Sequence, residues 1–256
     1  MKKAPPAKDI VFFPGWKKYG ADAGVTTKLF PVFLKKTDDL DHPANRFRLE
    51  EALRRSPSAA GARARFPGRF AYLQQVHGGK VAVLKKGAVP AGQKFTRLGE
   101  TDGVITDIPG LTLLAMTADC LSVYFYAPGW SGVVHAGWRG TQLRIAETAA
   151  KLILRESGRK PSELRVIFGP SICGKHYEVG PEFKAHFPGT ALSRKKEKYY
   201  FDLTRENENQ LRALGVPAKN FHFSDLCTVS GGRRFYSFRK EKESAGRMIS
   251  FIQITA

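Results

Sequence analysis

Four short runs of apolar residues with β-favouring side chains dominate the middle of the chain. Turn signals such as Pro109-Gly110 and Pro128-Gly129 separate these runs. The runs cover residues 102–107, 111–119, 121–127 and 131–138. Because apolar residues fill them almost without interruption, we expect buried strands that are covered on both faces.

Helical periodicity begins directly after these runs. Ile145, Ala149, Leu152 and Ile153 recur at helical spacing between residues 141 and 157, and Gly158 favours a helix end. Weaker patterns predict helices at residues 45–55, 180–187 and 204–214. Further strands are predicted at 24–36, with an interruption at Pro31, and at 69–78, 80–86, 164–170 and 248–254. Residues 87–100, rich in Gly, Pro and polar side chains, are expected to form a loop.

The order of these elements defines the expected fold class. Strands and helices are interspersed, and no linker or internal repeat divides the chain. We therefore expect the α/β (α+β) class, with a single-domain layered sandwich over residues 1–256 and a mixed β-sheet flanked by helices. Residues 1–20 are expected to be a poorly ordered or peripheral N-terminal segment.

Composition narrows the environment in which the chain works. Of its 256 residues, 42% are apolar, which is enough for a sizeable core. No apolar run approaches the roughly 18 residues of a membrane helix, and the first residues have no continuous apolar stretch, so we expect neither a membrane span nor a signal peptide. Three cysteines cannot all pair, and thiols in a reducing cytoplasm are the simpler interpretation.

The chain carries a large positive charge. Its formal net charge of +19 would attract polyanions such as phosphates, nucleotides or nucleic acid. The basic residues are scattered along the chain, and no RNA-binding aromatic signature accompanies them. A solvated surface is therefore the simpler interpretation, and a nucleic-acid-binding module is the weaker hypothesis.

Three residues offer ligands of the kind that zinc prefers. His77 precedes two glycines, Cys120 ends the sequence TADC, and His135 begins HAGWRG. Cys120 and His135 are 15 residues apart (135 − 120), which suits a hairpin that brings their strand ends together. Three protein ligands leave an open position, whereas a closed structural zinc site has four. Each residue also has an ordinary interpretation, because loop histidines and small buried cysteines are common.

Six motifs occur along the chain in one order: QVHG, TDG…TD, TADC, HAGWRGT, GPSI…YEVG and CT…FYSFRK…GR. This set resembles the YfiH-type family, whose members are described as laccase-domain or polyphenol oxidase proteins. The resemblance runs from about Gly24 to the end of the chain. It implies a purine nucleoside phosphorylase with adenosine deaminase activity or, as in some members, a peptidoglycan editing factor. It also implies that His77, Cys120 and His135 bind one zinc ion.

Three departures from the family pattern bear on the substrate. Lys28 stands where the family has an arginine followed by glycines, and Leu121-Ser122 follows TADC where a proline is usual. Between Cys173 and Tyr177 the chain has Gly, Lys and His in place of an adjacent cysteine. These changes concern substrate preference more than metal binding.

Other residues near these motifs are candidates for catalysis or substrate binding. Arg139 can bind phosphate through its guanidinium or form an ion pair that holds the hairpin. Asp119 can orient a metal ligand or carry a proton. Cys120, Asp119 and Arg139 form the expected catalytic set. The expected substrate-binding residues are Gln75, Arg139, Cys173, His176 and Tyr236, of which the tyrosine can stack on a purine or pack in the core. Cys227 is expected to be a buried thiol.

The leading hypothesis is a zinc-dependent enzyme that acts on purine nucleosides and phosphate. Phosphate would attack the ribose of adenosine, guanosine, inosine or methylthioadenosine, and zinc-activated water would deaminate adenine at C6. A hydrolase that edits a peptidoglycan precursor and a polyanion-binding protein with a structural metal are the alternatives. A copper polyphenol oxidase is disfavoured, because six histidines are too few for a copper cluster and a mixed histidine and cysteine set suits zinc.

Overall fold

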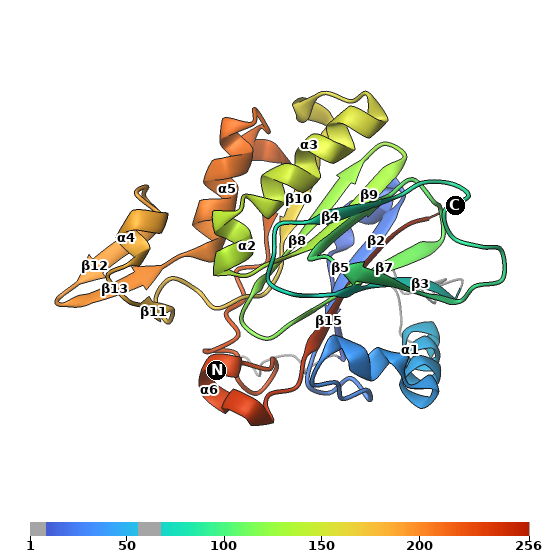
Figure 1. The fold of residues 1–256 in the computed structure, drawn as a ribbon, viewed down its shortest axis with the longest axis horizontal. Coiled ribbons are helices and arrows are strands. Elements are labelled where there is room, and N and C mark those ends of the chain that lie inside the picture. The colour runs from blue at the N-terminus through green and yellow to red at the C-terminus, as the bar shows by residue number, and fades with distance from the viewer. Residues whose placement is uncertain (1–8, 56–67, 256) are drawn as a thin grey trace, which may run out of the picture.

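The computed structural model describes residues 9–55 and 68–255, and its centre is a sandwich of two six-stranded sheets (Figure 1). In spatial order, the first sheet contains β1 (Ile10–Phe12), β2 (Ala21–Thr26), β15 (Met248–Ile254), β7 (Leu111–Thr117), β3 (Arg69–Gln74) and β5 (Phe95–Glu100). The second contains β14 (Phe221–Phe223), β10 (Arg165–Phe168), β8 (Leu121–Ala127), β9 (Trp130–Ala136), β6 (Gly103–Thr106) and β4 (Val81–Leu84).

Both sheets combine parallel and antiparallel pairs. In the first sheet β3 is parallel to β5 and β7, whereas β15 is antiparallel to β2 and β7. In the second sheet β10 is parallel to β14, and β8 and β9 form an antiparallel hairpin. The mixed layered sandwich predicted from the sequence is confirmed.

An apolar layer joins the inner faces of the two sheets. Ala23 and Leu113 of the first sheet belong to the same buried cluster as Tyr124, Val133 and Ile167 of the second. Every residue of β7, β8 and β9 is buried, as the uninterrupted apolar runs predict. Because these strands are buried along their whole length, they form a rigid support for the candidate site at their ends.

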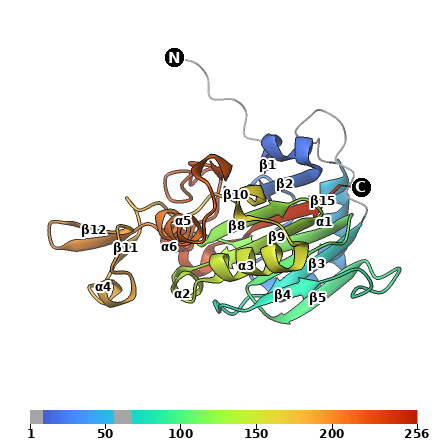
Figure 2. The same cartoon turned by 90° about the horizontal axis from the view of Figure 1, so that it is seen from above.

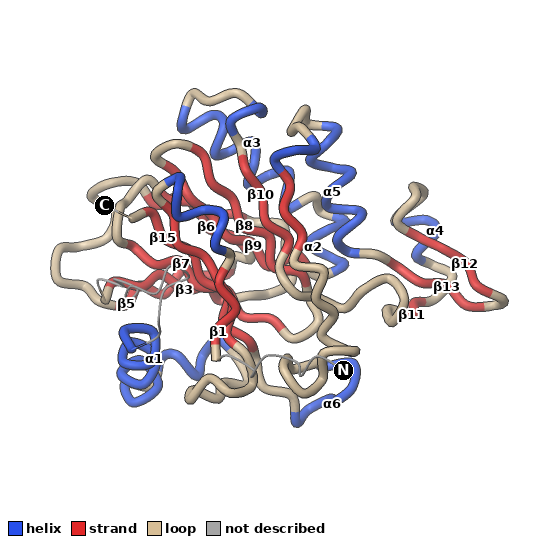
Figure 3. Tube along the Cα trace, turned by 180° about the vertical axis from the view of Figure 1, so that it is seen from behind, coloured by secondary structure: helices blue, strands red, loops and turns tan. Residues whose placement is uncertain are grey.

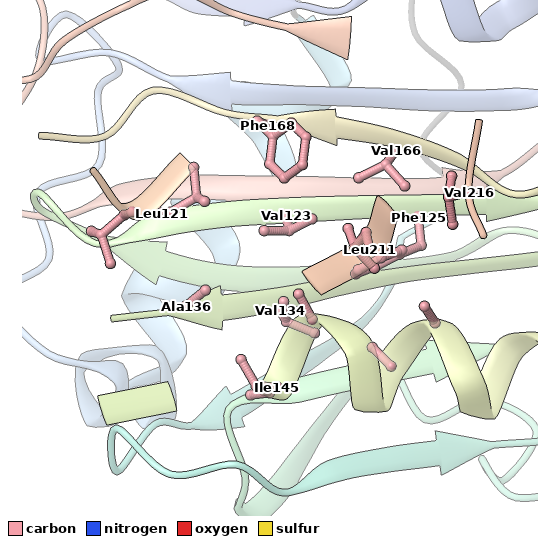
Figure 4. Close-up of a cluster of buried hydrophobic side chains, with 14 of the residues drawn as sticks. Leu121, Val123, Phe125, Val134, Ala136, Ile145, Val166, Phe168, Leu211 and Val216 are labelled. Carbon is pink, nitrogen blue, oxygen red and sulfur yellow. The ribbon is translucent and has the colours of Figure 1, made fainter. Parts of the chain in front are cut away.

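Helices cover the outer faces of both sheets (Figure 2). Helices α3 (Ile145–Ser157) and α5 (Leu203–Ala213) lie on the second sheet, where Ile145 and Leu211 pack with Val123 and Phe125 (Figure 4). Helix α1 (Pro43–Arg55) packs on the first sheet through Leu49 and Leu53. The molecule therefore has four layers: helix, sheet, sheet and helices.

A small three-stranded sheet extends from the sandwich as an arm (Figures 1 and 2). It contains β11 (Glu178–Val179), β12 (Leu192–Lys195) and β13 (Lys198–Phe201), and α4 (Phe183–His186) accompanies it. The remaining short helices are α2 (Trp138–Gln142), α6 (Phe238–Glu241) and the 3-10 turns η1 (Pro14–Tyr19), η2 (Thr37–Asp41), η3 (Pro161–Glu163), η4 (Ala218–Asn220) and η5 (Lys242–Ser244). Figure 3 shows α6 at the lower end of the sandwich, on the opposite side from α3.

The structure corrects four predicted elements. Residues 87–100 do not form only a loop, because Phe95–Glu100 is the edge strand β5, whose half-exposed polar residues give no apolar signal. The strand expected at 24–36 ends at Thr26. The helix expected at 141–157 is divided into α2 and α3 at Arg144, which has φ 57°. The helix expected at 180–187 has only the residues Phe183–His186.

The N-terminal segment contributes to the first sheet. Strand β1 pairs antiparallel with β2, and the Trp16 side chain is buried in the apolar cluster between the two sheets. The first eight residues of the expected peripheral segment lie outside the described residues. Among the residues that are described, no helix has both the length and the apolar character needed to cross a membrane.

Candidate functional site

Three side chains from three separate segments meet at one end of the sandwich. His77, Cys120 and His135 each offer one ligand atom, and these atoms lie within 4.8 Å of one another. The imidazole rings of His77 and His135 are 4.7 Å apart between centroids and nearly perpendicular. His135 is buried, Cys120 is half-buried and His77 is exposed, so the cluster is open on one side.

The hairpin of β8 and β9 places two of these residues side by side. Leu121 pairs with Ala136 and Ser122 with His135, so Cys120 lies just beyond the end of the ladder. The separation of 15 residues therefore brings Cys120 and His135 together as the sequence predicts. His77 reaches them from the turn after β3, where it has φ 59°, a left-handed conformation that is uncommon outside glycine.

Asp102 organises the cluster from beneath. Its fully buried carboxylate accepts hydrogen bonds from the backbone N–H groups of Val76, His77 and Gly78 at 3.1, 3.0 and 2.7 Å. One carboxylate oxygen also lies 2.8 Å from His135 Nδ1. Asp102 thus holds both the His77 turn and the His135 ring, and it leaves Nε2 of His135 for a metal.

The cluster favours a negative Cys120 thiolate beside a positive His135 imidazolium. Burial raises the pKa of Cys120, but the positive His135 and hydrogen bonds from both histidines outweigh it and lower this pKa to about 6. Burial lowers the pKa of His135, but the Cys120 thiolate and Asp102 outweigh it and raise this pKa to about 9. A thiolate is therefore available near neutral pH, which is the form of cysteine that binds metals.

Two glycines allow this close arrangement. A Cβ atom on Gly137 would lie 3.0 Å from Cys120 Sγ and 3.3 Å from His77 Cδ2. A Cβ atom on Gly140 would lie 3.0 Å from the Gly78 carbonyl oxygen. The glycines of HAGWRG therefore leave room for the two neighbouring segments that carry His77 and Cys120.

The residues present fit a single zinc ion. One thiolate and two imidazoles are a ligand set typical of zinc, and three protein ligands leave a position for substrate or water. Asp102 fixes the His135 ring in the carboxylate–histidine arrangement that is common around protein zinc. We therefore treat the cluster of His77, Cys120 and His135 as a candidate zinc centre.

The candidate centre opens into a pocket of about 520 Å³ that is rich in cations. The positively charged residues that line it are Lys35, Lys36, Arg239, Lys242 and Arg247. The pocket also has two aromatic side chains, Phe238, which is 41% exposed, and Tyr177. Burial raises the pKa of the Tyr177 phenol above its ordinary value, so the phenol stays protonated and can donate a hydrogen bond.

Asp119 lines this pocket, but both of its carboxylate oxygens already accept hydrogen bonds. The Thr228 hydroxyl donates to one oxygen at 2.6 Å, and the Arg239 backbone N–H donates to the other at 2.6 Å. The second bond attaches the start of α6 to the TADC turn. Asp119 therefore holds Phe238 and Arg239 at the pocket.

The other expected site residues divide into three groups: one lines this pocket, two do not, and two line a different pocket. Gln75 lines the pocket, but its amide exchanges two hydrogen bonds with the backbone of Met116, at 2.8 and 2.7 Å. Arg139 is exposed and stacks on Trp138, with its guanidinium carbon 4.3 Å from the ring centroid. Tyr236 packs edge-to-face on Phe33, and it is absent from the described lining of the pocket, as is Arg139. Cys173 and His176 line a different pocket, together with Cys227.

Lys28 has partners that direct it away from the pocket. Its ammonium donates to the Gly232 carbonyl oxygen at 2.9 Å and to a Glu241 carboxylate oxygen at 2.8 Å. It also lies over the Tyr236 ring. The lysine that replaces the family arginine thus joins the first sheet to the C-terminal segment.

Sequence reasoning did not select four functional candidates: Asp102, Arg239, Phe238 and Arg247. Asp102 lies within the TDG motif, and a carboxylate at the start of an apolar run is a signal of a buried partner. Arg239 and Phe238 lie within FYSFRK, and Arg247 lies within the following GR. Local spacing gave no reason to prefer these residues to Tyr236 or Arg139.

A two-sheet α/β sandwich with a His-Cys-His cluster at the end of one hairpin defines a class of metal-associated proteins. The chain belongs to the multi-copper polyphenol oxidoreductase laccase family, whose sequence model matches residues 24–255. This membership confirms the resemblance found in the sequence motifs. The family name implies several copper ions, but the chain has only six histidines. The two possible metal-binding groups among the described residues are both small mixed sets of histidine and cysteine.

Solved structures and curated relatives agree with this family. The crystal structure of a hypothetical protein YfiH from Bacillus licheniformis is 28% identical, with a TM-score of 0.81 over 98% of both chains. The structure of YlmD from Geobacillus stearothermophilus is 31% identical, with a TM-score of 0.77 over 93% of both chains. A curated protein from that organism, named purine nucleoside phosphorylase YlmD, is 34% identical over 196 aligned residues, and the match covers 72% of each chain.

Proposed function

We propose that this chain is a zinc-dependent purine nucleoside phosphorylase that also deaminates adenosine. The observation that carries the proposal is the joining of a His-Cys-His cluster to a cationic pocket with an exposed aromatic ring. This one pocket contains groups that are suited to bind phosphate, a purine and a metal. The curated relatives named purine nucleoside phosphorylase support the same activity.

Phosphate binding is assigned to the pocket cations. Arg239 and Arg247 are half-buried, so their hydrogen bonds to an anion are screened less than those of the exposed Lys35 and Lys36. Guanidinium groups bind phosphate in a bidentate manner. Arg139, which stacks on Trp138 and does not line the pocket, is not assigned to phosphate.

The purine is assigned to the aromatic side of the pocket. Phe238 presents an exposed ring on which a base can stack. The protonated Tyr177 phenol can donate a hydrogen bond to the ring nitrogen of a departing base. In phosphorolysis, a phosphate oxygen forms a bond to ribose C1′ as the glycosidic bond breaks, and the base leaves with a proton.

The metal ligands complete the assignment. His77, Cys120 and His135 would hold one zinc ion, with Asp102 orienting His135. When bound, zinc would supply Lewis acidity toward phosphate or water at its open position. Deamination would add water at C6 of adenine and release ammonia. Because the same pocket would hold the purine in both reactions, one site can support both. We place the enzyme in the cytoplasm, since the three cysteines are free thiols in the structure.

A product analysis tests the proposal. Purified full-length protein with stoichiometric zinc is incubated with adenosine, guanosine or inosine, with and without phosphate, and the products are separated by chromatography. Free base and ribose 1-phosphate should form only with phosphate, and inosine and ammonia should form from adenosine. Absence of adenine, hypoxanthine and inosine from the zinc-loaded protein would overturn the proposal.

Variants separate the roles of the metal and the cations. Cys120→Ala should remove the zinc of this centre and the activity together. Arg247→Gln should raise KM for phosphate about 10- to 100-fold, because a charge-assisted hydrogen bond contributes about 1.5–3 kcal/mol. Arg155→Gln, at an exposed arginine on α3, is the matched control and should leave KM unchanged. Release of an amino acid from a peptidoglycan precursor, or phenol oxidation by copper-loaded protein, would support the alternative functions instead.

A further inference from the structure

A second cluster of sulfur and imidazole ligands lies outside the candidate zinc centre. Cys173, His176 and Cys227 each offer one ligand atom, and these atoms lie within 4.8 Å of one another. Both thiol sulfurs approach the same ring nitrogen, with His176 Nδ1 at 3.2 Å from Cys173 Sγ and 3.4 Å from Cys227 Sγ. One atom of each residue therefore converges on a common point.

The backbone holds the two segments that carry these ligands. Cys173 and His176 belong to a tight turn in which the Cys173 carbonyl oxygen accepts hydrogen bonds from His176 N–H and Tyr177 N–H, at 2.9 and 3.1 Å. An isolated parallel bridge pairs Ser171 with Cys227. The Cys173 backbone N–H also points to Cys227 Sγ at 3.5 Å. The cluster is thus arranged by the fold and does not depend on long flexible side chains.

Gly174 shows how closely this turn packs. A Cβ atom at this position would lie 3.0 Å from the Asp202 Cβ atom. Asp202 is the N-cap of α5, where its side chain accepts a hydrogen bond from Arg205 N–H at 3.0 Å. The turn between the two ligands Cys173 and His176 is therefore fixed against a helix start.

The distances match those around a tetrahedral zinc ion. Zinc binds sulfur at about 2.3 Å and imidazole nitrogen at about 2.0–2.1 Å, so a sulfur and a nitrogen on one ion lie about 3.6 Å apart. The observed separations of 3.2 and 3.4 Å need only small side-chain movements to reach this value. Two thiolates with one imidazole form a soft donor set that selects zinc over magnesium or calcium.

We propose that Cys173, His176 and Cys227 form a second zinc site, with three protein ligands and a fourth position open to solvent. This site borders a pocket of about 980 Å³ between the arm and the edge of the second sheet, with Ser193 and Tyr200 on the arm side and Phe223 on the sheet side. The described linings of this pocket and of the pocket at His77 share no residue. The second site is therefore separate from the centre assigned to catalysis.

The second ion would join two segments that also hold Asp119. Ile172, next to Cys173, donates its backbone N–H to the Asp119 carbonyl oxygen at 2.9 Å. Thr228, next to Cys227, donates its hydroxyl to the Asp119 carboxylate at 2.6 Å. A metal that ties Cys173 to Cys227 thus stabilises the wall of the first pocket from behind.

Metal counting on the full-length protein tests this site. The protein is stripped of metal with a chelator and titrated with Co²⁺ under reducing, oxygen-free conditions. Two equivalents should bind, and the thiolate charge-transfer absorbance of the second site should be about twice that of the first, since it has two thiolates where the first has one. Zinc added beyond one equivalent should further raise Tm.

Single variants assign each equivalent to its site. His176→Ala and Cys227→Ser should each lose one equivalent and keep the one at Cys120, whereas Cys120→Ala should lose the other. His222→Ala, at an exposed histidine of β14, is the matched control and should keep both. Because the His176 side chain is exposed, its variant is expected to fold, which circular dichroism checks.

Three results would overturn the second site. In the first, the wild-type protein binds one metal and Cys120→Ala binds none. In the second, Cys227→Ser and His176→Ala bind as much metal as the wild-type protein. In the third, the thiolate charge-transfer absorbance of the Co²⁺-loaded protein is unchanged in Cys227→Ser and disappears completely in Cys120→Ala.

Discussion

Asp102 and His135 are joined twice, once through the side chains and once through the backbone. His135 Nδ1 lies 2.8 Å from an Asp102 carboxylate oxygen, and the His135 backbone N–H donates to the Asp102 carbonyl oxygen at 2.7 Å. The same carboxylate collects three N–H groups of the His77 turn. One buried acid therefore sets the positions of two of the three candidate zinc ligands.

The first prediction concerns the Asp102→Asn variant. An amide has only one acceptor oxygen and no charge, so it cannot satisfy the His77 turn and the His135 ring together. We expect zinc affinity at the His77, Cys120 and His135 centre to fall about 10- to 100-fold. We also expect the free energy of unfolding to fall by about 1–3 kcal/mol. Chelator competition and denaturant unfolding measure the two effects.

Asp107→Asn is a control for this substitution. Asp107 accepts a hydrogen bond from the Lys86 backbone N–H at 2.8 Å, outside the centre. It should change stability slightly and leave zinc affinity unaltered. Equal zinc affinity in Asp102→Asn and the wild-type protein would show that Asp102 does not orient the ligands.

The second prediction concerns space at Gly137. This residue has φ −71°, which alanine adopts readily, so Gly137→Ala adds crowding without backbone strain. The new methyl group would lie 3.0 Å from Cys120 Sγ and 3.3 Å from His77 Cδ2. We expect zinc affinity to fall about 10- to 100-fold while the fold is kept, because the ligands must separate. Gly99→Ala, where a Cβ atom meets nothing within 4 Å, should bind zinc normally.

The third prediction is the pH dependence of metal binding to the first centre. In the metal-free protein, the pKa of Cys120 is lowered to about 6 and that of His135 is raised to about 9. Cys120 has therefore already lost its proton above pH 6, whereas His135 keeps a proton that must leave when zinc binds. The apparent zinc affinity should rise about tenfold per pH unit from about pH 7 to pH 9, and then level off.

This dependence is measured best in His176→Ala, which leaves only the first centre. Calorimetry in buffers of different ionisation enthalpy should report the release of about one proton per zinc near the middle of this range. Affinity that does not change between these pH values would show that His135 is neutral before zinc arrives.

Much of the fold and of the metal cluster could be predicted from the sequence. The uninterrupted apolar runs of β7, β8 and β9 identify buried strands, and a two-residue turn at Pro128-Gly129 fixes the register that puts Cys120 beside His135. Edge strand β5 escaped prediction because its residues are half-exposed and do not alternate. The arm strands β12 and β13 escaped because all of their residues except the buried Phe201 are exposed or half-exposed.

The pocket could not be predicted because distant segments build it. Arg239 reaches it only because its backbone N–H is held by Asp119, which is 120 residues earlier in the chain. Arg247 lies at the pocket because the next residue, Met248, pairs with Thr117 where β15 runs beside β7. No local pattern encodes either relationship. A sequence motif can therefore indicate the right segment, FYSFRK, while the choice of residue within it requires the structure.

The fourth prediction distinguishes Phe238 from Tyr236 within that segment, and it rests on the proposed function. Phe238 is exposed in the pocket, whereas Tyr236 packs against Phe33 with ring centroids 5.7 Å apart. Stacking of a base on an aromatic ring contributes about 1–3 kcal/mol. Phe238→Ala should therefore raise KM for purine nucleosides about tenfold without changing KM for phosphate, and Phe238→Trp should restore the lower KM.

Tyr236→Ala should instead lower the free energy of unfolding by about 1–3 kcal/mol and leave both KM values near those of the wild-type protein. Steady-state kinetics and denaturant unfolding of the three variants decide the matter, because a raised nucleoside KM in Tyr236→Ala alone would assign stacking to Tyr236.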